Sequence, residues 1–231
     1  HAMKGTLHTV TLDGRFCACL VPQGTGPFPL AVLCGWGLEE KLAVYAQDLP
    51  PAVLFYARAD GNRDFTPWPA PPIREGELFS GGAEGYLRFL TETALPYIEK
   101  EWGAGPRPEA RGILGYSLGG LFALWAQRQE SCFQLAGSLS GSLWYPGWLD
   151  YLEQHPSRQQ EKVYLSLGDR EEYGGPPLLR TVGDCTRRTH ALCEASGAET
   201  VLEWNRGGHG KAVDSRWIKA LTWAIPKLRE E

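Results

Sequence analysis

The sequence predicts a single α/β domain over residues 1–231, with a mainly parallel central sheet, helices on both faces and an N-terminal antiparallel hairpin. Strand and helix patterns alternate through most of the chain, which is typical of βαβ units. Short apolar runs such as residues 30–34 have the length of strands that are buried on both faces. The 231 residues suit one large domain, and a hydrophobic content of 43% supplies its core.

The first quarter of the chain is expected to form strands. Residues 6–12 and 15–21 flank Asp13-Gly14, a turn signal that predicts a hairpin. Residues 30–34 (LAVLC) and 52–57 (AVLFYA) are apolar runs bounded by Gly and Pro, as in buried parallel strands. The segment 38–47 between them predicts a short helix.

Residues 58–82 predict a long irregular loop, because four prolines and several glycines exclude regular structure there. A loop of this length inside a compact domain is usually either disordered or functional. Three aromatic residues favour an ordered loop near a functional site: Phe65, Trp68 and Phe79.

Helices and strands alternate in the rest of the chain. Residues 83–101 have the apolar stripe of a long helix, and Pro96 is expected to kink it. The elements expected after it are strands at residues 112–116, 135–140, 163–167 and 200–205, and helices at residues 119–129, 184–196 and 214–227.

The segment Gly115-Tyr116-Ser117-Leu118-Gly119 matches the Gly-x-Ser-x-Gly nucleophile elbow. In this motif a serine occupies a strained strand-to-helix turn, and its neighbours two residues away must be small. A glycine-rich helix start capped by serine is the alternative for the pentapeptide alone. The apolar strand before it and the apolar helix after it favour the nucleophile, with the N–H of Leu118 placed to bind an oxyanion.

A serine nucleophile needs a histidine base, which in this fold follows the serine and the acid along the chain. His155, His190 and His209 follow Ser117. His155 precedes every plausible acid, and His190 lies within an expected helix. His209 lies in a glycine-rich loop between the last strand and the last helix, which lets its ring reach the strand ends. The sequence therefore predicts His209 as the general base, with a surface loop histidine as the alternative.

The acid of such a triad belongs in the loop after the strand at residues 163–167. Three carboxylates lie there within four residues: Asp169, Glu171 and Glu172. Position alone does not select one of them.

The sequence resembles the esterase branch of the α/β hydrolases described as "Putative esterase", which includes the enterochelin (siderophore) esterases, S-formylglutathione hydrolase and the mycolyltransferases. Five segments carry the resemblance, in the family's order. They are Arg63-Asp64-Phe65-Thr66-Pro67, the stretch from Gly81-Gly82-Ala83 to Ile98, the elbow with its trailing Gly120, residues 138–145 (SLSGSLWY) and Gly207-Gly208-His209.

The resemblance implies an α/β-hydrolase fold and roles for particular residues. Ser117 and His209 match the family's nucleophile and base. The family's Gly-x-x-Glu acid loop falls on Gly168 and Glu171, which favours Glu171 as the acid, with a Ser–His dyad as the alternative. The second oxyanion donor comes from the loop after the first central strand, which here is the N–H of Trp36 or Gly37.

Aromatic residues in the expected site loops predict a pocket wall for the substrate. The candidates for substrate binding are Trp36, Trp144 and Tyr145, with completion of loop packing as the alternative. Arg63 is a further candidate, for an acidic or catecholate group, although an ion pair with Asp64 is the favoured role.

The expected reaction is hydrolysis of a carboxylic ester through an acyl-enzyme, with an ester of siderophore type or of another small molecule as the substrate. An acyltransferase on the same fold and a non-catalytic binding protein are the alternatives. No cofactor and no metal ion is implied. The sequence does not determine the physiological substrate or the oligomeric state.

The composition argues against nucleic-acid-binding and membrane proteins. A net charge of −4 argues against a nucleic-acid or anionic-membrane partner, and no apolar stretch approaches the roughly 18 residues of a membrane span. The six scattered cysteines are expected to be free thiols in a cytoplasmic protein. Residues 1–3 are interpreted as a cloning remnant.

Overall fold

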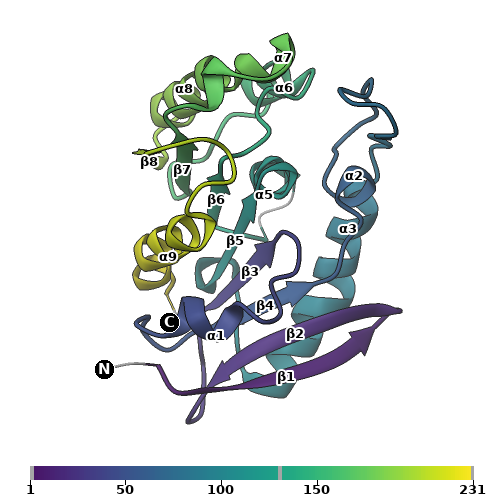
Figure 1. Ribbon diagram of the computed structural model, residues 1–231. Helices are drawn as coiled ribbons and strands as arrows, with labels where there is room; N and C mark the ends of the chain where they lie inside the picture. The colour runs from purple at the N-terminus through teal and green to yellow at the C-terminus, as the bar shows by residue number, and fades with distance from the viewer. Residues whose placement is uncertain (1–2, 130–131, 230–231) are drawn as a thin grey trace.

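A computed structural model describes residues 3–129 and 132–229 (Figure 1). Its eight strands form one sheet in the order β1-β2-β4-β3-β5-β6-β7-β8. β2 pairs antiparallel with β1 and β4, whereas all pairs from β4 to β8 are parallel. The strands are β1 (Gly5–Leu12), β2 (Arg15–Pro22), β3 (Leu30–Cys34), β4 (Val53–Ala57), β5 (Arg111–Tyr116), β6 (Leu135–Leu139), β7 (Lys162–Gly168) and β8 (Glu199–Asn205). The predicted sheet and N-terminal hairpin are confirmed.

The hairpin turn forms because Asp13 and Gly14 both have positive φ angles, of 48° and 78°. That combination is the type I′ turn, whose twist matches the twist of the two strands. β1 and β2 pair from Gly5 opposite Pro22 to Leu12 opposite Arg15. β1 is largely exposed at the sheet edge, while β2 is buried beside β4.

Helices cover both faces of the sheet and bury two hydrophobic layers (Figure 1). Alternate residues of one strand contact opposite layers, as Val32 and Leu33 do. One layer is completed by α1 (Leu42–Ala46) and α9 (Val213–Ala224). The other is completed by α3 (Ala83–Phe89), α4 (Leu95–Trp102), α5 (Leu118–Gln129), α6 (Trp148–Gln154) and α8 (Val182–Ala195).

The long helix expected at residues 83–101 is interrupted. A π-helical turn at Leu90–Ala94 separates α3 from α4, and Pro96 lies in the first turn of α4. Proline is tolerated in a first helical turn because the N–H groups there have no intrahelical acceptor. The irregularity in this helical segment is thus a π-helical turn directly before Leu95 and Pro96.

Three short helices were not predicted. α2 (Gly61–Asp64) lies inside segment 58–82, so the prediction that this segment lacks regular structure is wrong. Its prolines begin only at Pro67, after α2 has ended. α6 and α7 (Pro177–Arg180) were also missed, although a proline in the first turn of α7 is a helix-start signal. Single turns of 3-10 helix complete the fold at Pro108–Ala110, Glu171–Tyr173 and Ile225–Lys227.

Of residues 1–3, which are interpreted as a cloning remnant, the first two lie outside the described residues, whereas the N–H of Met3 donates to the carbonyl of Gln47 (3.0 Å). Within residues 3–129 and 132–229, no helix combines the length and the apolar character that crossing a membrane requires.

Candidate active site

Ser117 lies in the sharp turn between β5 and α5. Its φ of +61° places it in the left-handed region, where a serine is strained. Its backbone N–H donates to the carbonyl of Leu139 (3.0 Å), which fixes the turn against β6. A Cβ atom at Gly115 would overlap the carbonyl of Gly119, and one at Gly119 would overlap the carbonyl of Cys34. Only glycine fits at these two positions, as the elbow motif predicts.

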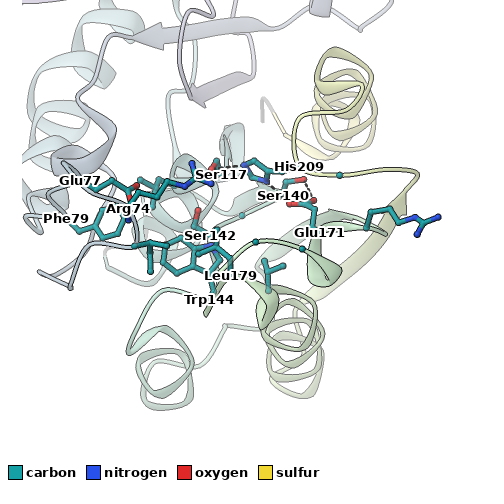
Figure 2. Close-up of a pocket in the computed structure, with 18 residues that line it drawn as sticks. Arg74, Glu77, Phe79, Ser117, Ser140, Ser142, Trp144, Glu171, Leu179 and His209 are labelled. Atoms are coloured by element: carbon teal, nitrogen blue, oxygen red, sulfur yellow. Dashed lines mark hydrogen bonds and ion pairs between the residues drawn. The ribbon is translucent and has the colours of Figure 1, made fainter. Parts of the chain in front are cut away.

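His209 connects Ser117 to Glu171 through two hydrogen bonds (Figure 2). Its Nε2 lies 3.0 Å from Ser117 Oγ, and its Nδ1 lies 2.6 Å from Glu171 Oε1. The three residues follow the carboxyl ends of β5, β7 and β8, which meet at one edge of the parallel sheet. The His209 side chain is 52% exposed, whereas the Glu171 side chain is 5% exposed.

Glu171 remains ionised in this buried position. Burial works to raise its pKa, but hydrogen bonds from His209, the Gly168 N–H (2.6 Å) and Ser140 Oγ (2.8 Å) outweigh it and hold the pKa below its ordinary value. The neighbouring carboxylates have other partners. Asp169 accepts from the Gly207 N–H (2.8 Å), and Glu172 forms an ion pair with Arg187 (2.7 Å). Of the three candidate acids, the structure brings only Glu171 to His209.

The expected oxyanion donors differ in their hydrogen bonding. The N–H of Leu118 is in the first turn of α5, where N–H groups have no intrahelical acceptor. The N–H of Gly37 donates to the Tyr56 hydroxyl (3.2 Å). Gly37 is thus engaged elsewhere, and Trp36 is the remaining candidate in its loop.

A cavity of about 380 Å³ opens at Ser117. Its apolar wall is formed by Phe79 and Trp144 together with aliphatic side chains from the segment 58–82 and from α5, α7 and α8. Figure 2 shows Arg74 extending from the segment 58–82 toward Ser117, with Glu77 beside it. The remaining lining includes Ile73, Ser140, Gly141, Ser142, Arg170, Leu179, Val182 and Gly208.

One of the four predicted substrate-binding residues, Trp144, lines this cavity. The other three are not among the residues that line it. Tyr145 is 2% exposed, and its hydroxyl donates to the carbonyl of Trp68 (2.5 Å). Arg63 pairs with Asp64 (2.9 Å), which is the role favoured from the sequence. The Trp36 ring packs edge-on against Phe65, at a centroid distance of 5.7 Å.

Sequence reasoning missed Arg74 and Arg216. Arg74 lies in a loop with no periodic pattern, and its direction depends on how that loop folds. Arg216 lies in the last helix, is 1% exposed and reaches Ser140, Tyr116 and the carbonyl of Gly208. An arginine seven residues after the candidate base indicates a role at the site only when the structure shows that its side chain is buried.

The chain matches a family model and two known proteins. The family model described as "Putative esterase" matches residues 36–228. The uncharacterized protein YbbA of Bacillus subtilis is 30% identical over 228 residues, covering 95% of this chain and 89% of YbbA. The ferri-bacillibactin esterase BesA of the same organism is 27% identical over 240 residues, covering 97% of this chain and 76% of BesA.

Solved structures share the fold. An IroE-like serine hydrolase from Shewanella oneidensis has a TM-score of 0.79 at 17% identity, covering 96% of this chain and 80% of the other. The siderophore hydrolase EstA from Aspergillus nidulans has a TM-score of 0.73 at 18% identity, covering 98% and 95%. The fold is therefore the α/β-hydrolase fold, as predicted.

The family model and the fold together define an esterase of the α/β-hydrolase class. The chain belongs to the "Putative esterase" family, with YbbA and BesA among its relatives.

Proposed function

We propose that Ser117, His209 and Glu171 form a catalytic triad that hydrolyses esters through an acyl-enzyme. The observation that carries the proposal is the continuous hydrogen-bonded chain from Ser117 Oγ to Glu171. His209 takes the proton of Ser117 as the hydroxyl oxygen attacks the ester carbonyl, and then returns it to the leaving alcohol. Glu171 holds the ring with Nε2 toward Ser117 and stabilises the imidazolium that forms.

The oxyanion of the tetrahedral intermediate would be bound by the N–H groups of Leu118 and Trp36. Leu118 directly follows the nucleophile at the start of α5, where the helix dipole also favours negative charge. Trp36 is favoured over Gly37 because the Gly37 N–H already donates to Tyr56.

Water is the expected acceptor of the acyl group. About half of the His209 side chain is exposed, so water reaches the base that must activate it in deacylation. This exposure favours hydrolysis over transfer to a second alcohol or thiol.

The cavity fits an aromatic ester that carries negative charge, such as a catecholate siderophore. Phe79 and Trp144 offer flat surfaces for aromatic groups. The guanidinium of Arg74 has no hydrogen-bond or ion-pair partner among the described residues, and it extends toward Ser117 (Figure 2). An anionic group of the substrate would pair with it. The ferri-bacillibactin esterase BesA and the siderophore hydrolase EstA, which are similar to this chain, support a siderophore ester as the substrate.

Labelling with a fluorophosphonate probe tests the nucleophile. Wild type is expected to react at Ser117, and Ser117→Ala is expected to lose labelling and to lower kcat by roughly 10⁴-fold or more. Ser142 also lines the cavity and provides a matched control, because its replacement by Ala leaves the Ser117–His209 contact in place. Equal labelling of wild type and Ser117→Ala contradicts the proposal.

Ester hydrolysis by Arg74→Met tests the substrate class. We expect KM to rise about 10-fold for a catecholate ester and to stay within about 2-fold for a neutral p-nitrophenyl ester. Arg88→Met is the control, since Arg88 lies on α3 and pairs with Glu84 at the surface. Equal KM changes for both esters count against an anionic substrate.

We also infer a cytoplasmic location. Cys17, Cys19, Cys34 and Cys193 are buried thiols without disulfide bonds, which suits a reducing compartment. Fractionation of the source cells with an antibody to the protein tests this, and recovery outside the cytoplasm contradicts it.

A further inference from the structure

We infer that Arg216 is a positioning residue for catalysis, whose buried guanidinium links the acid Glu171 to the loop that carries His209. This inference rests on the proposed triad of Ser117, His209 and Glu171.

The first step is the anchoring of Arg216 itself. It lies in the first turn of α9 and is 1% exposed. The next residue, Trp217, is also 1% exposed and stacks on Tyr45 at a centroid distance of 6.0 Å. Because α9 is packed against the sheet at this point, the guanidinium has a fixed origin in the core.

On the acid side, Arg216 Nη1 lies 2.7 Å from Ser140 Oγ and 3.5 Å from Glu171 Oε2. Ser140 Oγ in turn donates to the same Oε2 (2.8 Å), and the Gly168 N–H does so as well (2.6 Å). Three donors thus hold Oε2, which leaves Oε1 directed at His209 Nδ1. Figure 2 shows the Ser140 and Glu171 side chains together on this side of His209.

On the base side, Arg216 Nη2 donates to the carbonyl of Gly208 (2.7 Å), the residue before His209. Arg216 Nη1 also donates to the Tyr116 hydroxyl (3.1 Å), and this hydroxyl donates to the carbonyl of His209. The backbone on both sides of the His209 ring is therefore tied to one guanidinium.

The planar fork of an arginine makes this double contact possible. Nη1 and Nη2 are held rigidly apart, so one side chain fixes the acid and the base loop relative to each other. The compact ammonium of a lysine carries the charge but not the fork. The His209 loop contains Gly207, Gly208 and Gly210, so its own backbone does little to hold the ring. Misplacement of a catalytic group by about 1 Å costs as much as 10²-fold in rate.

Steady-state kinetics on a short p-nitrophenyl ester tests the inference. Arg216→Met is expected to lower kcat about 10- to 100-fold with KM within about 2-fold of wild type, because Arg216 does not line the cavity. Arg216→Lys is expected to lower kcat by at least about 5-fold, because charge without the fork ties only one side. A kcat within 2-fold of wild type in either variant overturns the inference.

Arg128→Met controls for the loss of a buried arginine. Arg128 forms an ion pair with Glu161, just before β7 begins and hence at the opposite edge of the sheet. It is expected to lower the melting temperature while the folded protein keeps its kcat. A loss of kcat equal to that of Arg216→Met would make the effect one of general stability and overturn the inference.

Tyr116→Phe keeps the inference testable if Arg216→Met does not fold. The change removes one hydroxyl from the link between Arg216 and His209, and kcat is expected to fall about 3- to 10-fold at unchanged KM. Wild-type kcat in Tyr116→Phe overturns the two-sided role.

A double-mutant cycle separates this inference from the proposed triad. If Arg216 acts through Glu171, Arg216→Met costs less in the Glu171→Gln background than in wild type. Equal losses in both backgrounds overturn the inference. Full activity of Ser117→Ala would instead overturn the proposed function. If Ser117→Ala is inactive but the Arg216 variants keep the kcat of wild type, only the inference about Arg216 is overturned.

Discussion

The Glu171 carboxylate is charged although it is almost completely buried, and the hydrogen bonds around it explain how it keeps its charge. Isolated carboxylates lose their charge when removed from water. Here Oε2 accepts from Ser140, the Gly168 N–H and Arg216, while Oε1 accepts from His209. A Cβ atom at Gly168 would lie 3.0 Å from Oε2, so glycine at this position also keeps the approach to the acid open.

The lowered pKa of Glu171 predicts a pH dependence of stability. A carboxyl whose folded pKa is below its ordinary value of 4.5 contributes stability that is complete above that value. The contribution is lost as the pH falls through the folded pKa. The free energy of unfolding of wild type should therefore exceed that of Glu171→Gln by a constant margin above about pH 5.5, and the margin should shrink toward pH 3. Urea denaturation from pH 3 to 7 measures it, and a margin independent of pH would be inconsistent with a charged Glu171.

Glu171→Gln should also lower kcat by about 10²- to 10⁴-fold, because a neutral amide neither stabilises the imidazolium nor fixes its tautomer. Asp169→Asn is the matched control, because Asp169 accepts a hydrogen bond from the Gly207 N–H and does not contact the His209 ring. Wild-type kcat in Glu171→Gln would favour the Ser–His dyad.

Among the elements, the turn from β5 to α5 tolerates the least change. Gly119→Ala would force a Cβ into the carbonyl of Cys34 on the neighbouring strand β3, and backbone cannot yield as a side chain can. We expect a loss of about 3 kcal/mol or more in the free energy of unfolding. Gly85→Ala is the control within α3, where a Cβ meets nothing within 4 Å. It should stabilise by about 1 kcal/mol, and urea denaturation of both variants compares them.

The short helix α2 attaches the cavity loop to the hairpin. Asp64, at its end, is 2% exposed and pairs with Arg15 of β2 (3.0 Å) and with Arg63. Although burial works to raise its pKa, these hydrogen bonds hold the pKa of Asp64 below its ordinary value. The loop that carries Arg74 and Phe79 therefore starts from a charged, buried anchor.

Asp64→Asn should lower the free energy of unfolding by about 3 kcal/mol at pH 7, because both arginines lose a buried partner. KM should rise as well, since the loop that forms one cavity wall loses its anchor. Asp48→Asn, at an exposed position, should change stability by less than about 0.5 kcal/mol. Thermal denaturation and ester kinetics provide the comparison, and equal effects of the two changes would argue against the anchor.

Across the whole molecule, tight burial should control thiol reactivity. Burial raises the pKa of Cys17 to about 11 and that of Cys34 well above its ordinary value. Iodoacetamide at pH 8 should therefore leave Cys34 unmodified in the native protein, whereas the partly exposed Cys185 should react before it. Mass spectrometry after timed alkylation measures this, and rapid native labelling of Cys34 would contradict the close packing of β3.

Much of the fold follows from short-range patterns. Some features are determined by neighbours within a few residues, and the structure contains each of them. They are the Asp13-Gly14 turn, the apolar runs of β3 and β4, and the elbow glycines. The short helices α2, α6 and α7 were missed because four to seven residues carry too little periodicity. The sequence shows where the aromatic residues are but not which way their side chains point. Tyr145 was therefore expected to line the pocket, although it is buried and does not line the cavity.

By itself, the sequence determined a parallel α/β sheet, a serine at a strand-to-helix elbow and a histidine on a glycine-rich loop. Only the tertiary structure decided that Glu171, and neither Asp169 nor Glu172, contacts that histidine, and that Arg216 reaches both. The reason is physical. An elbow is a local backbone conformation, whereas the contacts of Glu171 join residues up to 45 positions apart and exist only once strand order and helix packing are set.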